Sequence, residues 1–328
     1  MCIRDSIIIA SGSSAKSIKG IQFDNKKIFS SDSIINIDYI PKSIAIIGAG
    51  AVGVEFAGHF ARLGSRVYLI EIMDDILPSI EPELSGVLKA ALIKLGIEIY
   101  TSSKIVELNQ EEKYLAVTLS NKSTISADIM LVAASRTPNT SGLVQNLRLS
   151  DKGGFISVDN RMRTNIENIY AAGDVCGGLM LAHKASYQAR IAVLNIAGED
   201  IEADYSCIPV CIYTSPEIAS VGLKEREAKE MGFDLKVTKF PFRALGKARA
   251  IGRVDGFVKL IADKKSKVLL GAHLAGPLVT EFITELTMAI KFKIPYSDLI
   301  DLVHPHPTLQ ESIQEALCIL NDEPLHQF

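Results

Sequence analysis

The sequence predicts an α/β fold in which a doubly wound domain precedes a C-terminal α+β domain. Residues 42–71 run in the order strand, glycine-rich turn, helix, strand and acidic residue, which is typical of a doubly wound sheet. After residue 204 the apolar pattern changes to several strands followed by helices, as in an α+β domain. The length of 328 residues suffices for two or three domains.

The glycine-rich turn is a G-x-G-x-x-G fingerprint that follows the apolar, β-branched run of residues 43–47. Gly48 permits a tight turn out of the strand. Gly50 lets a pyrophosphate approach the backbone without meeting a Cβ atom, and Gly53 lets the following helix pack closely on the sheet. The N-terminus of that helix offers free N–H groups and a partial positive charge to phosphates. The fingerprint therefore predicts a dinucleotide site.

Glu71 ends the second strand, 18 residues after Gly53. This is close to the ~20 residues expected for the acid that binds the adenosine ribose. A hydrogen bond to a charged acceptor contributes ~1.5–3 kcal/mol, and the same carboxylate repels a 2′-phosphate, so we predict NAD rather than NADP. The alternative is a strand–helix turn without a ligand. The register of strand, helix, second strand and acid favours the dinucleotide.

The composition excludes several classes of partner. The chain is 48% hydrophobic and 22% charged, with a net charge of −3, which argues against nucleic acid and anionic membranes. It contains no Trp, which disfavours binding to single strands. The longest apolar run, residues 44–54, is too short to span a membrane. No signal peptide is evident, so we expect a soluble protein of the cytoplasm or, in a eukaryote, the mitochondrial matrix.

The five cysteines are scattered and odd in number, which predicts reduced thiols rather than a disulfide framework. Cys207 and Cys211 invite a redox or metal interpretation. No further Cys or His follows at metal-ligand spacing, so buried structural thiols are favoured and no metal site is predicted.

The remaining elements follow from periodicity and turn residues. The first six residues fit no element and are set aside as a candidate foreign sequence. Residues 7–14 are expected to form a strand that runs into a turn of small residues, and residues 15–35 are expected to be irregular. The predicted helices are 82–96, 180–198, 281–293 and the segment from Pro307 to Leu320. The predicted strands are 97–101, 105–108, 114–119, 123–126, 129–134, 169–174, 206–213, 218–221, 235–240, 256–262 and 268–274.

Two residues outside the fingerprint are candidates because of their positions. Asp174 ends a short strand, at the end of a sheet where α/β proteins bind ligands, although a turn or helix-capping role fits as well. His306 is flanked by Pro305 and Pro307, which restrict the backbone. Glu311, one turn into the expected helix, could set the imidazole tautomer. Spacing alone slightly favours a surface histidine in a proline-rich turn.

In chain order these motifs resemble the flavin disulfide reductases, or pyridine nucleotide-disulfide oxidoreductases, and within them the dihydrolipoyl dehydrogenases. The resemblance covers nearly the whole chain. The matching stretches are residues 9–13, 48–55, 71, 135–139, 171–175, 180–185, 213–222 and 304–311.

The resemblance implies roles for individual residues. Asp174 would bond the ribityl chain of FAD, and His306, oriented by Glu311, would be the acid–base of dithiol–disulfide exchange across a homodimer interface. The other residues that would face FAD are Ser11, Gly12, Ser13, Met180, Leu181, Ala182 and His183. Those that would line the NAD site are Gly48, Ala49, Gly50, Ala51, Val52, Gly53, Val54, Glu55, Glu71, Ile105 and Ser135.

The resemblance also implies a domain division and an activity. Residues 1–36 and 154–203 would be parts of a partial FAD-binding domain, 37–153 the NAD-binding domain and 204–328 the dimerisation domain. The implied reaction oxidises protein-bound dihydrolipoamide and passes electrons through a disulfide and FAD to NAD. The implied partner is the lipoyl domain of a 2-oxo acid dehydrogenase or glycine cleavage complex.

The sequence departs from this family in three ways. It lacks a first FAD fingerprint and a C-x-x-x-x-C pair, and Ser135 stands where the family usually has Gly, which is expected to crowd the nicotinamide side. We therefore expect an N-terminally truncated chain with an intact NAD domain, no tightly held FAD and no lipoamide activity. Alternatives are a non-catalytic NAD-binding and dimerising remnant, or a relative such as mercuric reductase or soluble transhydrogenase. Glu71 disfavours NADP-dependent relatives such as glutathione reductase.

Overall fold

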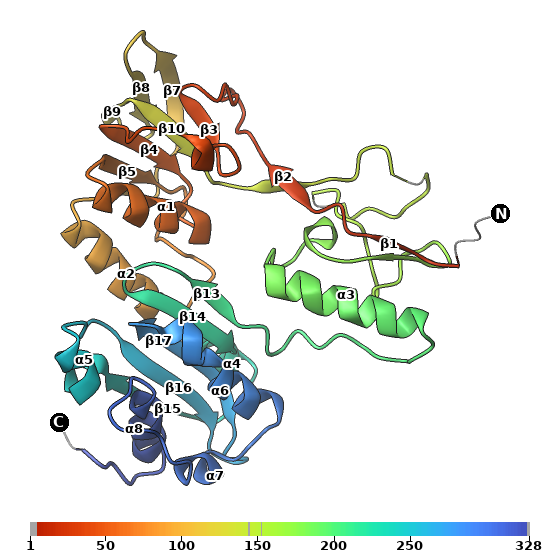
Figure 1. The fold of residues 1–328 in the computed structure, drawn as a ribbon, viewed down its shortest axis with the longest axis vertical. Helices are drawn as coiled ribbons and strands as arrows, with labels where there is room; N and C mark the ends of the chain where they lie inside the picture. Colours follow the sequence, from red (N-terminus) through yellow and green to blue (C-terminus); the bar gives the residue numbers. More distant parts are fainter. Residues whose placement is uncertain (1–4, 144, 152, 327–328) are drawn as a thin grey trace. The chain divides into compact units, whose positions relative to one another are not determined.

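A computed structural model describes residues 5–143, 145–151 and 153–326 (Figure 1). The chain forms two compact units. The first combines the chain up to Ile18 with Ser135–Tyr205, and the second combines Lys19–Ala134 with the chain from Ser206 onward. Of the six residues set aside as foreign, the first four lie outside the described residues. The predicted four-part division of domains stays a prediction.

A five-stranded parallel sheet forms the nucleotide half of the second unit. The strands lie in the order β3 (Ile28–Ser30), β10 (Ile129–Val132), β4 (Ser43–Ile47), β5 (Arg66–Ile70) and β6 (Glu98–Tyr100). Helices α1 (Ala51–Arg62) and α2 (Pro82–Lys94) connect successive strands. The central strands are almost wholly buried, which explains their unbroken apolar sequences.

Strand β3 corrects the expectation that residues 15–35 are irregular. Its three residues are buried and pair with β10 in parallel register. Only Ile28 and Phe29 are strongly apolar in this strand. A run this short carries no period of its own, and its pairing with a distant strand makes it a strand.

The predicted hairpin of residues 114–126 is confirmed. It forms β8 (Leu115–Leu119) and β9 (Thr124–Ala127), and β7 (Ile105–Gln110) adds a third antiparallel strand. Lys122 lies in the turn with a φ of 69°. The alternating burial of β8 matches its alternating apolar sequence.

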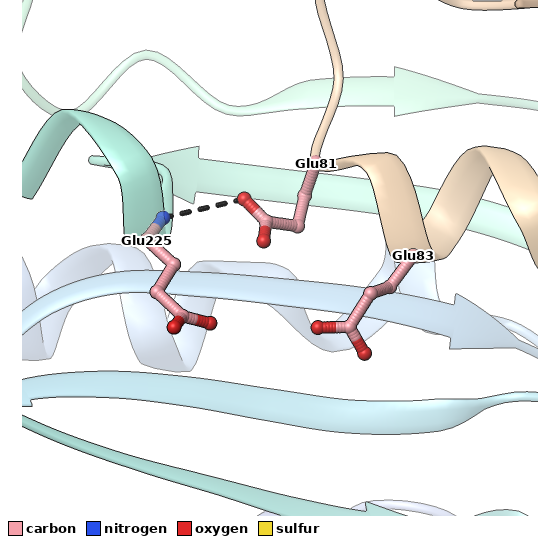
Figure 2. A group of neighbouring side chains, drawn as sticks. All are labelled: Glu81, Glu83 and Glu225. Atoms are coloured by element: carbon pink, nitrogen blue, oxygen red, sulfur yellow. Dashed lines mark hydrogen bonds between the residues drawn. The ribbon is translucent and has the colours of Figure 1, made fainter.

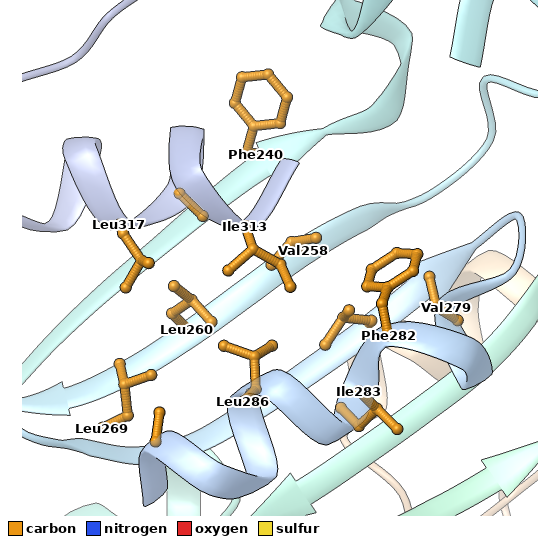
Figure 3. Packing of buried hydrophobic residues seen from close by; sticks show 14 of the residues in the cluster. Phe240, Val258, Leu260, Leu269, Val279, Phe282, Ile283, Leu286, Ile313 and Leu317 are labelled. Atoms are coloured by element: carbon orange, nitrogen blue, oxygen red, sulfur yellow. The ribbon is translucent and has the colours of Figure 1, made fainter. Parts of the chain in front are cut away.

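An antiparallel sheet forms the other half of the second unit. Its order is β13 (Val210–Ile212), β14 (Glu217–Gly222), β17 (Leu269–Gly276), β16 (Phe257–Asp263) and β15 (Leu235–Pro241). Helices α6 (Val279–Lys291) and α8 (Glu311–Leu320) pack on one face, where Leu286 and Ile313 meet Leu260 (Figure 3). The strand predicted from residue 206 begins only after Pro209, which cannot donate to a ladder.

The two sheets of the second unit share a core. In β14, Ala219 belongs to the cluster beneath α6 and α8, whereas its neighbour Ile218 belongs to the cluster of the parallel sheet. Successive strand residues point to opposite faces. The antiparallel sheet is therefore covered by helices on one face and by the nucleotide half on the other.

Three short helices were not predicted, namely α4 (Glu225–Glu230), α5 (Gly246–Ala250) and α7 (Tyr296–Ile300). Each has five or six residues, so none spans enough turns to display a helical period. Tertiary contacts rather than sequence pattern fix them.

The first unit contains short paired strands and one long helix. Strand β1 (Ile7–Ile9) pairs with β12 (Ile169–Ala171) in parallel, and β2 (Ser13–Ala15) pairs with β11 (Arg136–Pro138) antiparallel. The helix predicted over residues 180–198 is α3 (Ala182–Ile196). Across the described ranges, no helix is both long and apolar enough to cross a bilayer.

Candidate functional site

The glycine fingerprint follows β4 at the carboxyl end of the parallel sheet. From β4 the chain continues through α1 to β5 on one side, and β10 pairs with β4 on the other side. Gly48 has a φ of 98°, and a Cβ atom there would lie 2.9 Å from the Ala133 carbonyl oxygen. A Cβ atom on Gly53 would lie 1.8 Å from the Gly48 carbonyl oxygen. A Cβ atom on Gly50 would meet nothing within 4 Å. Gly48 and Gly53 therefore permit the close packing of the turn against neighbouring backbone. Gly50 faces open space at the point where the strand order of the sheet reverses.

Helix α1 begins directly after Gly50, which is its N-cap residue. Within the described ranges no side chain caps this end, so the first-turn N–H groups are not satisfied by a cap. Val52 in the first turn is 41% exposed. Uncapped N–H groups and the helix dipole together suit an anionic group such as a pyrophosphate.

Glu71 is fixed against the fingerprint. Its carboxylate accepts hydrogen bonds from the backbone N–H of Ala49 at 2.6 Å and of Met73 at 2.9 Å. The residue is only 7% exposed. Each carboxylate oxygen retains acceptor capacity, so the group can still accept from a ribose hydroxyl, and it repels a phosphate at the same place. The residues of this cradle, Gly48 to Gly53 with Glu71, fit the pyrophosphate and adenosine ribose of a dinucleotide.

The other residues expected at the NAD site have different surroundings. Glu55 accepts a hydrogen bond from the Tyr213 N–H at 2.8 Å, and burial raises the pKa of this carboxyl despite that bond. Val54 is fully buried in the core. Ile105 is half-buried at the start of β7. Ser135 is exposed and belongs to the first unit.

The first unit gathers three of the polar groups near the expected FAD site. The Ser13 hydroxyl donates to Asp174 at 2.6 Å, and the Arg136 guanidinium donates to the Ser13 hydroxyl at 2.7 Å and to its carbonyl at 2.8 Å. Asp174 opens a 3₁₀ turn after β12 instead of ending the strand. Sequence reasoning missed Arg136, although it follows Ser135 directly.

The remaining residues expected near FAD lie in the loop after β1 and at the start of α3. The Ser11 hydroxyl donates to the Asn139 carbonyl at 2.7 Å, and Gly12 has a φ of 70°. Met180 is 38% exposed, and Ala182 and His183 are exposed in the first turn of α3. Leu181 is the N-cap residue, and no described side chain caps the helix. The Asp174 carboxylate can accept a hydrogen bond from a ribityl hydroxyl, and the start of α3 is uncapped. These two features fit one part of FAD.

The cysteines of the described chain are free thiols. Burial raises the pKa of Cys176 and of Cys211 to about 11 in each case. Cys207 and Cys211 are half-buried and pack against the core beneath α6 and α8. Because a reactive cysteine needs its thiolate near neutral pH, the pKa values of Cys176 and Cys211 argue against a redox role for them.

His306 and Glu311 form a hydrogen-bonded pair. The Nδ1 atom of His306 lies 2.7 Å from the Glu311 carboxylate, whose other oxygen accepts from the Thr308 N–H at 2.7 Å. Burial raises the pKa of Glu311, but the hydrogen bonds from His306 and Thr308 outweigh it and the pKa is lowered. The His306 side chain is 79% exposed, and its Nε2 atom has no hydrogen-bond partner among the described residues.

The helix after this pair begins later than expected. Glu311 is the first residue of α8 rather than one turn inside it, and Pro307 precedes the helix instead of opening it. The Glu311 carboxylate nevertheless reaches the imidazole, and its second oxygen accepts from the Thr308 N–H between the two residues. Glu311 also places a negative charge at the N-terminus of α8, where the helix dipole favours it.

Sequence reasoning missed an ionic cluster around a buried lysine in the second unit. Glu81, Glu83 and Glu225 come from the start of α2 and from α4, and their carboxylates converge (Figure 2). The Lys259 ammonium lies 2.6–2.7 Å from all three, with its side chain 1% exposed. Burial lowers the pKa of Lys259, but these hydrogen bonds outweigh it and raise the pKa. The ammonium thus fills the space that a cation would take.

Comparisons with known proteins identify the family. The family model described as pyridine nucleotide-disulphide oxidoreductase matches residues 4–189, and that of the pyridine nucleotide-disulphide oxidoreductase dimerisation domain matches residues 208–317. The chain belongs to the pyridine nucleotide-disulphide oxidoreductase family. The predicted resemblance and fold class, including the C-terminal dimerisation domain, are confirmed.

Similar proteins include several dihydrolipoyl dehydrogenases. The chain is 38% identical to mitochondrial dihydrolipoyl dehydrogenase 1 of Arabidopsis thaliana, a match that covers 98% of this chain and 64% of that protein. It is 40% identical to dihydrolipoyl dehydrogenase of Chlamydia pneumoniae, covering 98% of this chain and 69% of the relative. The chain thus spans about two thirds of the length of these relatives.

Two solved structures share the fold. LpdA from Mycobacterium tuberculosis has a TM-score of 0.91 and 26% identity, with 96% of this chain and 70% of that chain covered. The Cu(II) complex of the flavoprotein disulfide reductase RclA from Escherichia coli has a TM-score of 0.89 and 28% identity, with 96% and 72% covered. The family is thus one of oxidoreductases that act with a pyridine nucleotide.

Proposed function

We propose that this chain carries the NAD-binding and dimerisation parts of a dihydrolipoyl dehydrogenase. The complete reaction oxidises a protein-bound dihydrolipoamide and passes two electrons through a disulfide and FAD to NAD. The observation that carries this proposal is the cradle of Gly48 to Gly53 with Glu71 at the switch point of the parallel sheet. The named relatives at 38–40% identity supply the substrate class.

NAD is preferred to NADP because of Glu71. A carboxylate held by two backbone N–H groups cannot swing away from a 2′-phosphate. Burial strengthens the repulsion, because charges interact more strongly where water is excluded. The first turn of α1 would hold the pyrophosphate, and Gly50 would allow its close approach.

FAD would be held in part by residues of the first unit. Asp174, oriented by the Ser13 hydroxyl, would accept from the ribityl chain, and the uncapped start of α3 would face a polar edge of the flavin. When bound, FAD supplies the relay of an electron pair between the thiols and the nicotinamide.

His306 would accept the thiol proton at Nε2. The Glu311 carboxylate holds the proton of His306 on Nδ1, so the exposed Nε2 atom is the free base. The same carboxylate stabilises the imidazolium that forms after proton transfer. Removal of the proton produces the thiolate, which is the reactive form. We place this step across a homodimer interface, with the lipoyl domain of a 2-oxo acid dehydrogenase or glycine cleavage complex as partner.

The chain by itself would bind NAD without turning over lipoamide. None of its five cysteines forms a C-x-x-x-x-C pair, and the pKa values of Cys176 and Cys211 disfavour their thiolates. We place the protein in the cytoplasm or, in a eukaryote, in the mitochondrial matrix. A second candidate is the reduction of another disulfide-type substrate, which the fold similarity to RclA favours.

A fluorescence titration with NADH and NADPH tests the nucleotide site. We expect the wild-type chain to bind NADH at least tenfold more tightly than NADPH. Glu71→Gln should weaken NADH binding about fivefold, because a neutral acceptor replaces a charged one at a cost of ~1 kcal/mol. It should also narrow the discrimination against NADPH. Equal affinities of the wild type for both nucleotides, or no binding of either, would refute the proposal.

A further inference from the structure

A run of basic residues in the antiparallel half of the second unit has no acidic partners. Residues 243–254, here called the basic segment, contain Arg243, Lys247, Arg249 and Arg253 and no acidic residue, although the whole chain has a net charge of −3. The three arginines are exposed and Lys247 is half-buried. Within the part of the chain that the structure describes, none of the four forms an ion pair.

The cations on two nearby elements, α4 and β15, are each paired with a carboxylate. These pairs are Arg226–Glu230 and Lys229–Glu225 in α4, and Lys236–Asp322 and Lys239–Glu83 in β15. Their charges are therefore largely neutralised within the chain. The basic segment instead presents charges of one sign, and such a patch attracts groups of the opposite sign.

Packing and hydrogen bonds hold the basic segment in one conformation. Leu245 and Ala248 are buried in the core beneath α6 and α8. The Arg249 Nε atom donates to the Arg243 carbonyl at 2.6 Å, and the Arg253 N–H donates to the Ala248 carbonyl at 3.0 Å. The first bond uses one N–H of the Arg249 guanidinium and leaves its other donors available. A side chain that is already held loses less conformational entropy when it binds a partner.

Two exposed apolar side chains lie among these cations. Ile251 is 40% exposed and Val254 is 37% exposed, and Val254 directly follows Arg253. Protein–protein interfaces are enriched in arginine and place apolar contacts at their centre. The basic segment contains no aromatic residue on which a base could stack. These features favour an acidic protein over a nucleic acid as the partner.

We propose that the basic segment is a docking surface for an acidic protein segment that carries an apolar side chain. Carboxylates of the partner would pair with the three exposed arginines, which can each donate two parallel hydrogen bonds to a carboxylate. The apolar side chain of the partner would cover Ile251 and Val254. The surface includes neither the nucleotide cradle nor His306, so this proposal goes beyond the proposed function and does not depend on it.

Fluorescence anisotropy with the whole chain and labelled probes tests this proposal. The probes are a peptide of Glu and Leu residues, a peptide of equal length in which Ser replaces Leu, and a DNA duplex. At an ionic strength of ~0.15 M, we expect the wild type to bind the Glu–Leu peptide most tightly. The double variant Arg249→Gln, Arg253→Gln should weaken this binding about tenfold, because two charge pairs are lost. Ile251→Ser should weaken it about threefold and leave binding of the Glu–Ser peptide unchanged.

The double variant Lys94→Gln, Lys113→Gln is the matched control, because it removes the same charge elsewhere on the surface. Both lysines are exposed and have no ion pair in the described ranges. This variant should change the affinity for the Glu–Leu peptide less than about twofold. An equal loss in both double variants, or no binding of the peptide by the wild type, overturns the proposal. Tighter binding of the DNA duplex than of the peptide also overturns it, because the partner would then be a nucleic acid.

The anisotropy measurements need neither turnover nor a bound cofactor. NADH affinity and the melting temperature should match those of the wild type in both double variants, because each substitution replaces a surface side chain outside the cradle. Absence of NADH binding in the wild type would refute the proposed function, whereas the peptide affinities would still decide whether the basic segment is a docking surface.

Discussion

The fingerprint cradle and the His306–Glu311 pair both depend on a carboxylate, but they differ in how completely the chain surrounds them. Glu71 is 7% exposed and bonds two backbone N–H groups at the edge of a buried sheet. The His306 side chain is 79% exposed and makes one hydrogen bond. The cradle is formed by one continuous stretch of chain, whose backbone N–H groups fix the Glu71 carboxylate. His306 instead exposes a basic nitrogen to solvent and to an approaching substrate.

Because of this difference, the cradle and the His306–Glu311 pair should respond differently to substitution. Changes in or near the cradle disturb packing and should reduce both stability and nucleotide binding. Changes at His306 alter an exposed side chain and should affect only the chemistry.

Lys259→Met should cause the largest loss of stability, because it removes the cation that pairs with the buried Glu81 carboxylate. Glu83 and Glu225 keep Lys239 and Lys229 as partners. We expect the free energy of unfolding to fall by about 3–5 kcal/mol, as for other buried charges that lose their partner. Lys239→Met is the control, because Lys239 pairs with Glu83 from a position where its side chain is 47% exposed, and it should cost less than ~1 kcal/mol. Urea denaturation measures both, and equal losses would contradict a buried role for Lys259.

Gly53→Ala should disturb both stability and binding in the cradle. Its Cβ atom would lie 1.8 Å from the Gly48 carbonyl oxygen, so β4 and α1 must move apart, at a cost of about 1–3 kcal/mol. NADH binding should fall below detection in the same titration. Gly86→Ala, on the exposed face of α2 with nothing within 4 Å, should be neutral or slightly stabilising. Wild-type NADH affinity in Gly53→Ala would argue against the cradle.

Acid should weaken the Lys259 cluster through protonation of Glu225. Hydrogen bonds from Lys229 and Lys259 lower the pKa of Glu225 to about 2. A depressed carboxyl pKa stabilises the fold above the ordinary pKa of ~4.3, and this contribution is lost as the pH falls from there toward about 2. The stability difference between wild type and Glu225→Gln should thus be present at pH 6 and shrink at pH 2.5. A difference that is the same at both values would contradict the shift.

His306→Gln should have the smallest effect on the fold. An exposed side chain of this kind changes the free energy of unfolding by less than ~0.5 kcal/mol. NADH affinity should match that of the wild type, because the substitution leaves the cradle untouched. Thermal denaturation and the NADH titration measure these two quantities. A loss of more than 1 kcal/mol would mean that His306 has a structural role.

The parts that could be predicted from the sequence are those in which close neighbours in sequence are also neighbours in space. The contact of Glu71 with Ala49 follows from one strand–turn–helix–strand unit. The His306–Glu311 contact spans five residues, so spacing alone indicated it, although the start of α8 was misplaced.

The parts that could not be predicted depend on the packing of distant segments. Lys259 meets Glu81 across 178 positions, because the two sheets of the second unit share a core. Strand β3 exists through its pairing with β10. Glu285 reaches His304 from another helix. None of these contacts leaves a period or a motif in the sequence.

The measurement that tests the central claim most directly is a crystal structure of the chain with NADH. We predict that the pyrophosphate lies against Gly50 and the first turn of α1, with the adenosine ribose hydroxyls on the Glu71 carboxylate. A nucleotide bound away from this edge of the parallel sheet, or an empty cradle at millimolar NADH, would contradict the account.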